Sequence, residues 1–243
     1  MAGSGTLHVG DGSAEAPVLV LSNALGATAE MWRAQVQTFS RNFRLLRYEH
    51  PPLASVEALA LDLRAQLDRL EIERVSFCGL SLGGMVGMQL AADSPERLER
   101  LVLACTSARF GEPADWHEKA SRVRAEGMRG AAEEAIDLWL APNHPERARF
   151  LQMQLDADPE AYARGLEAIG GFDFRARLSD IQAPTLVLSG ERDVATTPAD
   201  GEFIAAGIAG ADFRVVPGAA HIANADVPEA FNTLAAGFLA EPR

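Results

Sequence analysis

A serine between glycines is the residue of this sequence whose surroundings best suit chemistry. Ser81 stands in the run Gly79-Leu-Ser-Leu-Gly83, after an apolar segment at residues 75–78 and before a segment with helical periodicity. A sharp turn from strand to helix puts such a serine into a strained backbone conformation, and flanking glycines leave room for the turn. The pattern predicts that Ser81 is a nucleophile. The alternative is a glycine-rich turn without a catalytic role.

A serine hydroxyl needs a base that takes its proton, and His221 is the histidine best placed to be that base. Imidazole is the side chain whose ordinary pKa suits proton transfer near neutral pH. His221 lies in a loop of small residues, after an apolar segment at residues 213–216 and before the last helical segment. The remaining histidines are expected to be solvated or packing residues: His8, His50, His117 and His144.

The imidazole in turn needs a carboxylate that holds its tautomer and stabilises its charged form. Asp193 is the predicted partner because it follows the apolar segment at residues 185–189, at the edge of the sheet where His221 is also expected. Glu191 is close in sequence and is easily mistaken for it. Asp226 follows His221 too closely to reach back easily. Asp193 without this role would be an ordinary acidic residue of a loop or helix N-terminus.

Attack on a carbonyl creates an oxyanion, and backbone N–H groups must already point at its position. The N–H of Leu82, the residue after the serine, is one predicted donor. Leu25, in the turn of small residues after the first apolar segment, is the other, with Ala24 as the alternative if the turn is shifted by one residue. Asn23 is expected to brace this turn through its amide.

The elements that must position these residues alternate between short β-rich segments and helical segments. The β-rich segments are residues 18–22, 43–48, 75–78, 101–105, 185–189 and 213–216, and helical periodicity covers residues 56–70, 82–93 and 227–239. Nearly every residue of the β-rich segments is apolar, which is typical of strands with helices on both faces. The alternation predicts the α/β class, with a doubly wound and mostly parallel sheet.

Between residues 108 and 177 the strand signal disappears. This stretch is rich in Ala, Glu and Arg and is interrupted by prolines and glycines, a pattern that favours several helices. The strand signal resumes at residue 185. We therefore expect a core of residues 1–107 and 178–243, with residues 108–177 forming a helical cap over the carboxyl edge of the sheet, where open α/β folds bind their ligands.

The composition restricts the possible partners of the chain. A formal net charge of -12 repels a phosphate backbone, so nucleic acid is not an expected partner. No apolar stretch is long enough for a membrane span, and the two cysteines, Cys78 and Cys105, suggest no disulfide framework. A cytoplasmic protein that acts on a small molecule is expected. No cluster with metal-ligand spacing calls for a metal or other cofactor, and no signal indicates an oligomeric state.

Eight short stretches of the sequence carry a resemblance to known proteins. They are Ser22-Asn-Ala-Leu-Gly26 with Met31-Trp32, Phe43-Arg-Leu-Leu-Arg-Tyr48, Phe77-Cys-Gly-Leu-Ser-Leu-Gly-Gly-Met85, Pro95-Glu-Arg97 with Leu101-Val-Leu-Ala-Cys-Thr106, Phe172-Asp-Phe-Arg-Ala-Arg-Leu178, and Ala219-Ala-His-Ile-Ala-Asn224. Along nearly its whole length the chain resembles the α/β-hydrolase superfamily, in which the order Ser81, Asp193, His221 is usual. It is most similar to the 3-oxoadipate enol-lactonases, hydrolases of the β-ketoadipate pathway in aromatic catabolism.

This resemblance implies that Ser81 opens a small carboxylate-bearing lactone through an acyl-enzyme, without a cofactor. A planar guanidinium suits a substrate carboxylate, and Arg47 and Arg109 are the expected substrate-binding arginines, with Arg33 as a further choice. Trp139 is expected to line the cap side of the pocket. The alternatives are a carboxylesterase or C–C hydrolase of the same fold, or a ligand-binding protein whose catalytic residues are vestigial.

One segment departs from the family pattern. The family usually carries a loop of the type Asp-x-Arg-Gly-His-Gly-x-Ser and about a dozen further residues after the strand that ends near Tyr48. In this sequence only seven residues separate that strand from the next helix, namely residues 49–55, Glu-His-Pro-Pro-Leu-Ala-Ser. Because that loop normally borders the mouth of the active site, we expect its shortening to widen the pocket or to alter the choice of substrate.

Overall fold

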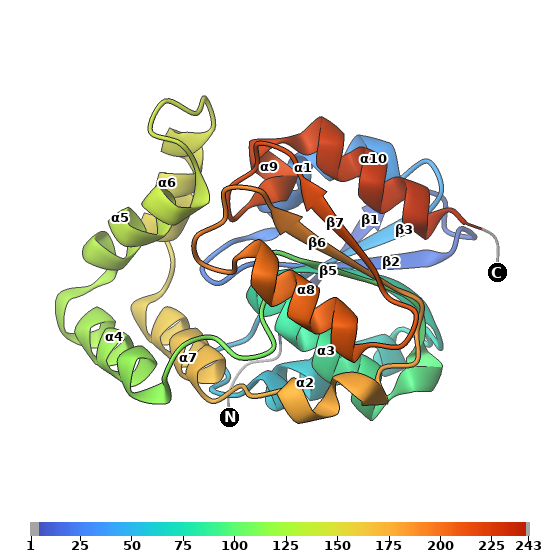
Figure 1. The fold of residues 1–243 in the computed structure, drawn as a ribbon, viewed down its shortest axis with the longest axis horizontal. Helices are drawn as coiled ribbons and strands as arrows, with labels where there is room; N and C mark the ends of the chain where they lie inside the picture. Colours follow the sequence, from blue (N-terminus) through green and yellow to red (C-terminus); the bar gives the residue numbers. More distant parts are fainter. Residues whose placement is uncertain (1–4, 242–243) are drawn as a thin grey trace.

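The computed structural model describes residues 5–241 and contains a twisted sheet of seven strands between two layers of helices (Figure 1). The strands are β1 (Thr6–Asp11), β2 (Val18–Ser22), β3 (Arg44–Glu49), β4 (Val75–Leu80), β5 (Leu98–Ala104), β6 (Thr185–Gly190) and β7 (Asp212–Val216). Their order is β1-β3-β2-β4-β5-β6-β7. β1 pairs antiparallel with β3, and the pairings from β3 to β7 are parallel. The predicted fold class, a mostly parallel doubly wound sheet, is confirmed.

The burial of the strands explains why their sequences are so uniformly apolar. Every residue of β4 and β6 is buried, because helices cover both faces of the sheet there. β5 begins three residues earlier than the apolar pattern indicated. Its first residues include Glu99 and Arg100, and the Glu99 carboxylate lies 3.1 Å from the guanidinium of Arg74. Because these first residues are charged, the apolar pattern did not reveal where the strand begins.

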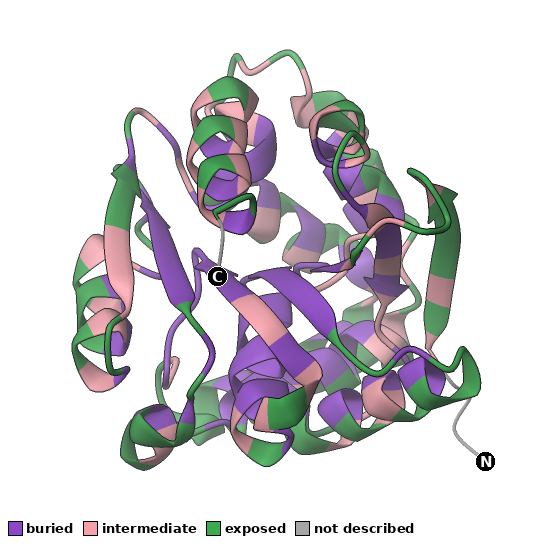
Figure 2. Cartoon of the chain, turned by 90° about the vertical axis from the view of Figure 1, so that its right-hand side faces the viewer, coloured by how far each residue is buried: buried purple, intermediate pink, exposed green. Residues whose placement is uncertain are grey.

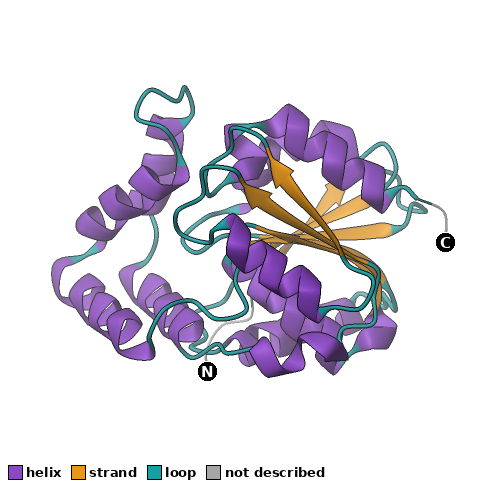
Figure 3. Ribbon diagram, in the orientation of Figure 1, coloured by secondary structure: helices purple, strands orange, loops and turns teal. Residues whose placement is uncertain are grey.

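Two layers of helices enclose the sheet (Figures 1 and 3). The helices α1 (Arg33–Phe39), α9 (Ala223–Asp226) and α10 (Pro228–Leu239) cover one face, and α2 (Val56–Arg69), α3 (Leu82–Asp93) and α8 (Pro198–Gly207) cover the other. Each layer buries its own apolar cluster, one around Trp32 and Phe231 and one around Leu63 and Val86. Figure 2 shows buried residues on the strands and on the helix sides that face them. None of the helices within residues 5–241 has the length and hydrophobicity needed to cross a membrane.

Four α-helices lie between β5 and β6, and they stand beside the sheet in Figure 1. They are α4 (Pro113–Glu126), α5 (Met128–Trp139), α6 (Arg147–Leu155) and α7 (Pro159–Gly170). α4 packs along α7, and α5 packs along α6. A bridge between Arg109 and Asp173 joins the segments that enter and leave this group. These helices face the end of the sheet where β2, β4, β6 and β7 have their carboxyl ends, because residues of α4, α5 and α7 line a cavity together with residues that follow those strands.

Candidate active site

Ser81 lies in the turn between β4 and α3 with φ 57° and ψ -116°, a left-handed conformation that a non-glycine residue rarely adopts. Two close backbone approaches explain the glycines beside it. A Cβ at Gly79 would lie 2.2 Å from the carbonyl oxygen of Gly83, and a Cβ at Gly83 would lie 2.2 Å from that of Ser22. The backbone N–H of Ser81 donates to Ala104 on the neighbouring strand. Residues 79 and 83 must therefore be glycine for the turn to close.

The structure brings together the three side chains that the sequence placed far apart. His221 Nε2 lies 3.0 Å from Ser81 Oγ, and His221 Nδ1 lies 2.9 Å from Asp193 Oδ2. Ser81 follows β4, Asp193 follows β6 and His221 follows β7, so all three lie at the carboxyl edge of the sheet. Each is more than nine-tenths buried. This geometry lets the imidazole take a proton from the hydroxyl while the carboxylate faces its other nitrogen.

Hydrogen bonds hold the Asp193 carboxylate in its ionised form. Oδ1 accepts from the N–H groups of Ala195 and Thr196, and Oδ2 accepts from Thr196 Oγ1 at 2.8 Å. Burial acts to raise the pKa of Asp193, but the attraction to His221 and these hydrogen bonds outweigh it and leave the pKa below its usual range. Thr196 was not among the residues predicted to belong to the site. The sequence did contain a signal for this contact, because a threonine three positions after an acidic residue is typical of a local turn closed by side-chain hydrogen bonds.

Two backbone N–H groups beside Ser81 have no acceptor among residues 5–241: those of Leu25 and Leu82. Leu82 is the first residue of α3, where an N–H has no partner within the helix. The N–H of Ala24, by contrast, donates to the sulfur of Met31 at 3.3 Å. Between the two candidates that the sequence left open, this favours Leu25 as the second donor to an oxyanion.

The turn that carries Leu25 is braced from two sides. Asn23 Nδ2 donates to the carbonyl of Ala27 at 3.1 Å, and Asn23 Oδ1 accepts from the indole N–H of Trp32 at 2.9 Å. From the cap, the buried Gln154 of α6 donates to the carbonyl of Leu25 at 3.1 Å. The sequence predicted the role of Asn23. It contained no local signal for Gln154, because that contact joins residues 129 positions apart.

A cavity of about 270 Å³ lies between Ser81, His221 and the cap, and Trp139 lines it. Two cations of α4 line the same cavity. Arg122 forms an ion pair with Glu134 at 2.7 Å. Lys119, the only lysine of the sequence, lies 5.1 Å from the ring centre of Trp116, and it forms no ion pair with a described residue. No group of three or more metal-ligating side chains occurs among the described residues.

The structure does not bring the expected arginines, Arg47, Arg109 and Arg33, into this cavity. Each guanidinium lies outside this cavity and forms an ion pair with one or two carboxylates. The partners are Asp11 and Glu30 for Arg47, Glu112 for Arg109, and Glu146 for Arg33. Their positions therefore do not support a role in binding a substrate at Ser81. The cations that line the cavity come from the cap, whose pose over the sheet the sequence pattern did not specify.

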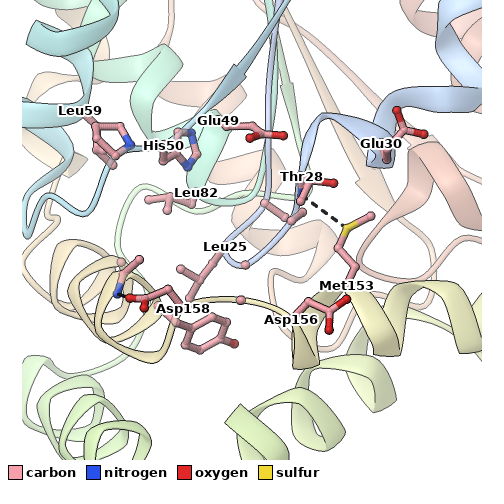
Figure 4. A pocket seen from close by; sticks show the side chains of 18 of the residues that line it. Leu25, Thr28, Glu30, Glu49, His50, Leu59, Leu82, Met153, Asp156 and Asp158 are labelled. Atoms are coloured by element: carbon pink, nitrogen blue, oxygen red, sulfur yellow. Dashed lines mark hydrogen bonds between the residues drawn. The ribbon is translucent and has the colours of Figure 1, made fainter. Parts of the chain in front are cut away.

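A second, larger cavity of about 620 Å³ lies beside the first (Figure 4). The shortened segment after β3 forms part of its wall through His50, Pro51 and Leu53. The cap helices α6 and α7 form the opposite wall. Leu25 and Leu82 also line it, and Figure 4 shows their side chains between His50 and the cap. The segment that departs from the family pattern thus borders a cavity next to the candidate catalytic residues.

His50 makes the stability of the fold sensitive to acid. Its Nε2 lies 2.9 Å from Ser22 Oγ, and burial lowers its pKa to about 4, although the carboxylate of Asp62 opposes this shift. The unfolded chain binds this proton below about pH 6.5, whereas the folded chain binds it only below about pH 4. Protonation therefore favours the unfolded state as the pH falls through this window. We expect His50 to account for a loss on the order of 2 kcal/mol in the free energy of unfolding.

Urea unfolding at pH 7 and at pH 4.5 measures this contribution. The His50→Gln variant keeps a hydrogen-bonding side chain beside Ser22 but cannot titrate, so its free energy of unfolding should fall less between the two pH values. His117→Gln is the matched control, because His117 is exposed on α4. An identical pH dependence in wild type and His50→Gln would contradict the assignment.

The fold agrees with comparisons to known proteins. The profile of the Alpha/beta hydrolase family matches residues 19–234, and the chain belongs to this family. It is a hydrolase. The chain is 34% identical to 3-oxoadipate enol-lactonase 2 of Acinetobacter baylyi over 235 residues, which cover 91% of this chain and 88% of the relative.

Two solved structures are similar to this chain over nearly its whole length. The enol-lactonase from Burkholderia xenovorans LB400 has a TM-score of 0.93 at 36% identity, with 99% of this chain and 98% of the other covered. A hydrolase from Pseudomonas aeruginosa PA01 also has a TM-score of 0.93, at 39% identity, with 99% and 97% covered. The resemblance to enol-lactonases inferred from the sequence is confirmed.

Proposed function

We propose that this protein is a serine hydrolase that opens a small carboxylate-bearing lactone through an acyl-enzyme on Ser81. The observation that carries the proposal is the contact of His221 with both Ser81, at 3.0 Å, and Asp193, at 2.9 Å. The two unpaired N–H groups of Leu25 and Leu82 beside this contact support it. The similarity to enol-lactonases supports the choice of a lactone.

The proposed reaction has two steps. His221 takes the proton of Ser81, and Ser81 Oγ forms a bond to the ring carbonyl carbon while the N–H groups of Leu25 and Leu82 hold the oxyanion. The bond from that carbon to the ring oxygen then breaks. The departing oxygen receives the proton from His221, which gives an enol, and the enol then tautomerises to a ketone. Water, deprotonated by the same histidine, then releases the acyl group from Ser81.

We place the carboxylate of the substrate beside Lys119 rather than beside Arg47 or Arg109. Lys119 lines the cavity that contains Ser81 and His221, and no carboxylate of a described residue neutralises it. Arg122 lines the same cavity but is already paired with Glu134. An ammonium group that no carboxylate of a described residue pairs with offers an anionic substrate an attraction that the other cation of the cavity, already paired, does not.

Rates on an enol-lactone and on short p-nitrophenyl esters test this substrate class. We expect kcat/KM to be at least about a hundredfold higher for the lactone, which corresponds to about 2.7 kcal/mol of transition-state preference. Because Lys119 is exposed, the Lys119→Met variant should raise KM for the anionic lactone by about threefold to fivefold and change KM little for an uncharged lactone. Arg129→Met is the control, because Arg129 is exposed on α5 and lines neither cavity. Faster turnover of the esters would favour the carboxylesterase alternative.

A further inference from the structure

Two residues at the carboxyl edge of the sheet, Ser81 and Cys105, have a left-handed backbone although neither is glycine, with φ 57° and φ 44°. Such a conformation costs free energy and persists only where neighbouring contacts impose it. The backbone N–H of Cys105 donates to the carbonyl of Leu188 on β6 at 2.7 Å. This hydrogen bond fixes the chain where it leaves β5, between Ala104 and Thr106.

The residues on either side of Cys105 hold the backbone of Ser81 through both of its polar groups. The carbonyl of Ala104 accepts from the N–H of Ser81 at 2.9 Å, and Thr106 Oγ1 donates to the carbonyl of Ser81 at 2.8 Å. Thr106 is only 2% exposed. A Cβ at Gly84 would lie 2.7 Å from Thr106 Cβ, so glycine at this position lets the threonine approach the first turn of α3.

The carbonyl that Thr106 contacts belongs to the same peptide group as the N–H of Leu82. This peptide bond is trans, and in a planar trans peptide the C=O and the N–H point in opposite directions. A donor that fixes the direction of the Ser81 carbonyl therefore also fixes the direction of the Leu82 N–H. A hydrogen bond to a peptide carbonyl also polarises the group, which makes its N–H a stronger donor.

We infer that Thr106 is a positioning residue for the oxyanion: its hydroxyl directs and polarises the peptide group whose N–H, that of Leu82, holds the negative oxygen. The inference rests on the proposed function, because it requires that Ser81 attacks a carbonyl. Thr106 lies outside the lining of the cavity that contains Ser81 and His221. It therefore acts through the peptide group and not by contact with the substrate.

The hydroxyl of Thr106 is not the sole partner of the Ser81 carbonyl. The N–H groups of Gly84 and Met85, in the first turn of α3, donate to the same oxygen at 2.9 and 3.1 Å. These donors move with α3, whereas Thr106 ties the carbonyl to the end of β5. Thr106→Val, which replaces the hydroxyl by a methyl group of similar size, therefore leaves the buried carbonyl with partners. Its melting temperature should stay within a few degrees of wild type.

Hydrolysis of p-nitrophenyl acetate by variants at position 106 tests the inference. Acylation and deacylation both pass through an oxyanion, so we expect Thr106→Val to lower kcat about tenfold and to leave KM within about twofold. Thr106→Ser keeps the hydroxyl and should restore kcat to within about threefold of wild type. Thr185→Val is the matched control, because Thr185 is also buried and donates to a carbonyl, that of Ala183, but lies at the amino end of β6.

Two inhibitors distinguish a weakened oxyanion site from a general distortion of the cavity. With a trifluoromethyl ketone, Ser81 Oγ bonds to the carbonyl carbon, the hydroxyl proton passes to His221, and the carbonyl oxygen becomes an oxyanion. The matching methyl ketone binds largely without this step. In Thr106→Val the inhibition constant should rise about tenfold for the trifluoromethyl ketone and stay within about twofold for the methyl ketone. Equal changes for the two ketones would overturn the inference.

The outcomes separate this inference from the proposed function. Labelling of wild-type Ser81 by a fluorophosphonate reports the serine mechanism alone. If Ser81 is labelled but Thr106→Val keeps the wild-type kcat, or Thr106→Ser fails to rescue it, the positioning role is overturned and the proposed function stands. A lower melting temperature with unchanged kcat would likewise reduce Thr106 to a structural residue. If Ser81 is neither labelled nor required for hydrolysis, both are overturned.

Discussion

The Ser81→Ala variant is expected to lose kcat/KM by a factor on the order of 10⁵ while its melting temperature stays within a few degrees of wild type. Without Oγ no acyl-enzyme can form, although the oxyanion donors and the cavity remain. The fold should tolerate the change because alanine has a Cβ like serine. The positive φ of this residue is therefore neither relieved nor worsened. Among residues 5–241 the Ser81 hydroxyl has one hydrogen-bond partner, His221, and this is the hydrogen bond that the variant loses.

Steady-state kinetics and a thermal melt on the same preparation check this result. Ser94→Ala is the matched control, because Ser94 lies at the opposite end of α3 and its hydroxyl accepts a hydrogen bond from Arg64. The control should retain activity within about threefold of wild type. Undiminished hydrolysis by Ser81→Ala would refute Ser81 as the nucleophile.

The Asp193→Asn variant should show the second largest effect, a loss in kcat/KM of about 10³-fold to 10⁴-fold. Asparagine preserves the shape of the side chain but removes the charge that stabilises the imidazolium. Its amide can also donate to His221 Nδ1, which favours the wrong tautomer of the base. The loss is incomplete because Ser81 and the N–H groups of Leu25 and Leu82 are still in place.

Glu191→Gln is the control that distinguishes Asp193 from the acid two positions earlier. The Glu191 carboxylate accepts a hydrogen bond from the N–H of Gly218 at 2.7 Å, whereas the carboxylate beside His221 Nδ1 is that of Asp193. Its variant should stay within about threefold of wild type. A larger loss in Glu191→Gln than in Asp193→Asn would mean that the supporting carboxylate had been misassigned.

The sequence was sufficient for the parts of the site that depend on local patterns. The glycines around Ser81 indicated a close approach of backbone segments. The apolar segments predicted the strands that precede Asp193 and His221. Because parallel strands share one edge, segment order alone predicted that these residues would meet. The class of fold follows from the same alternation of segments.

Contacts between distant segments could not be predicted in this way. Arg47 was a candidate for substrate binding until the structure paired it with Asp11 of β1. Lys119 was passed over because its relevance depends on how the cap lies over the sheet. The choice between Leu25 and Ala24 depended on the sulfur of Met31, which takes the N–H of Ala24. Each of these details arises from packing that a periodic pattern does not encode.

The bond from Gln154 to the carbonyl of Leu25 makes the cap and the oxyanion turn a single mechanical unit. The same helix, α6, reaches this turn twice more, through Met153, whose sulfur accepts from the N–H of Thr28, and through Arg149, which donates to the carbonyl of Glu30. Any movement of the cap away from the sheet must therefore displace the Leu25 peptide, which faces the reacting carbonyl. Any redesign of this scaffold by exchange of caps therefore has to transplant residues 147–155 together with residues 23–30.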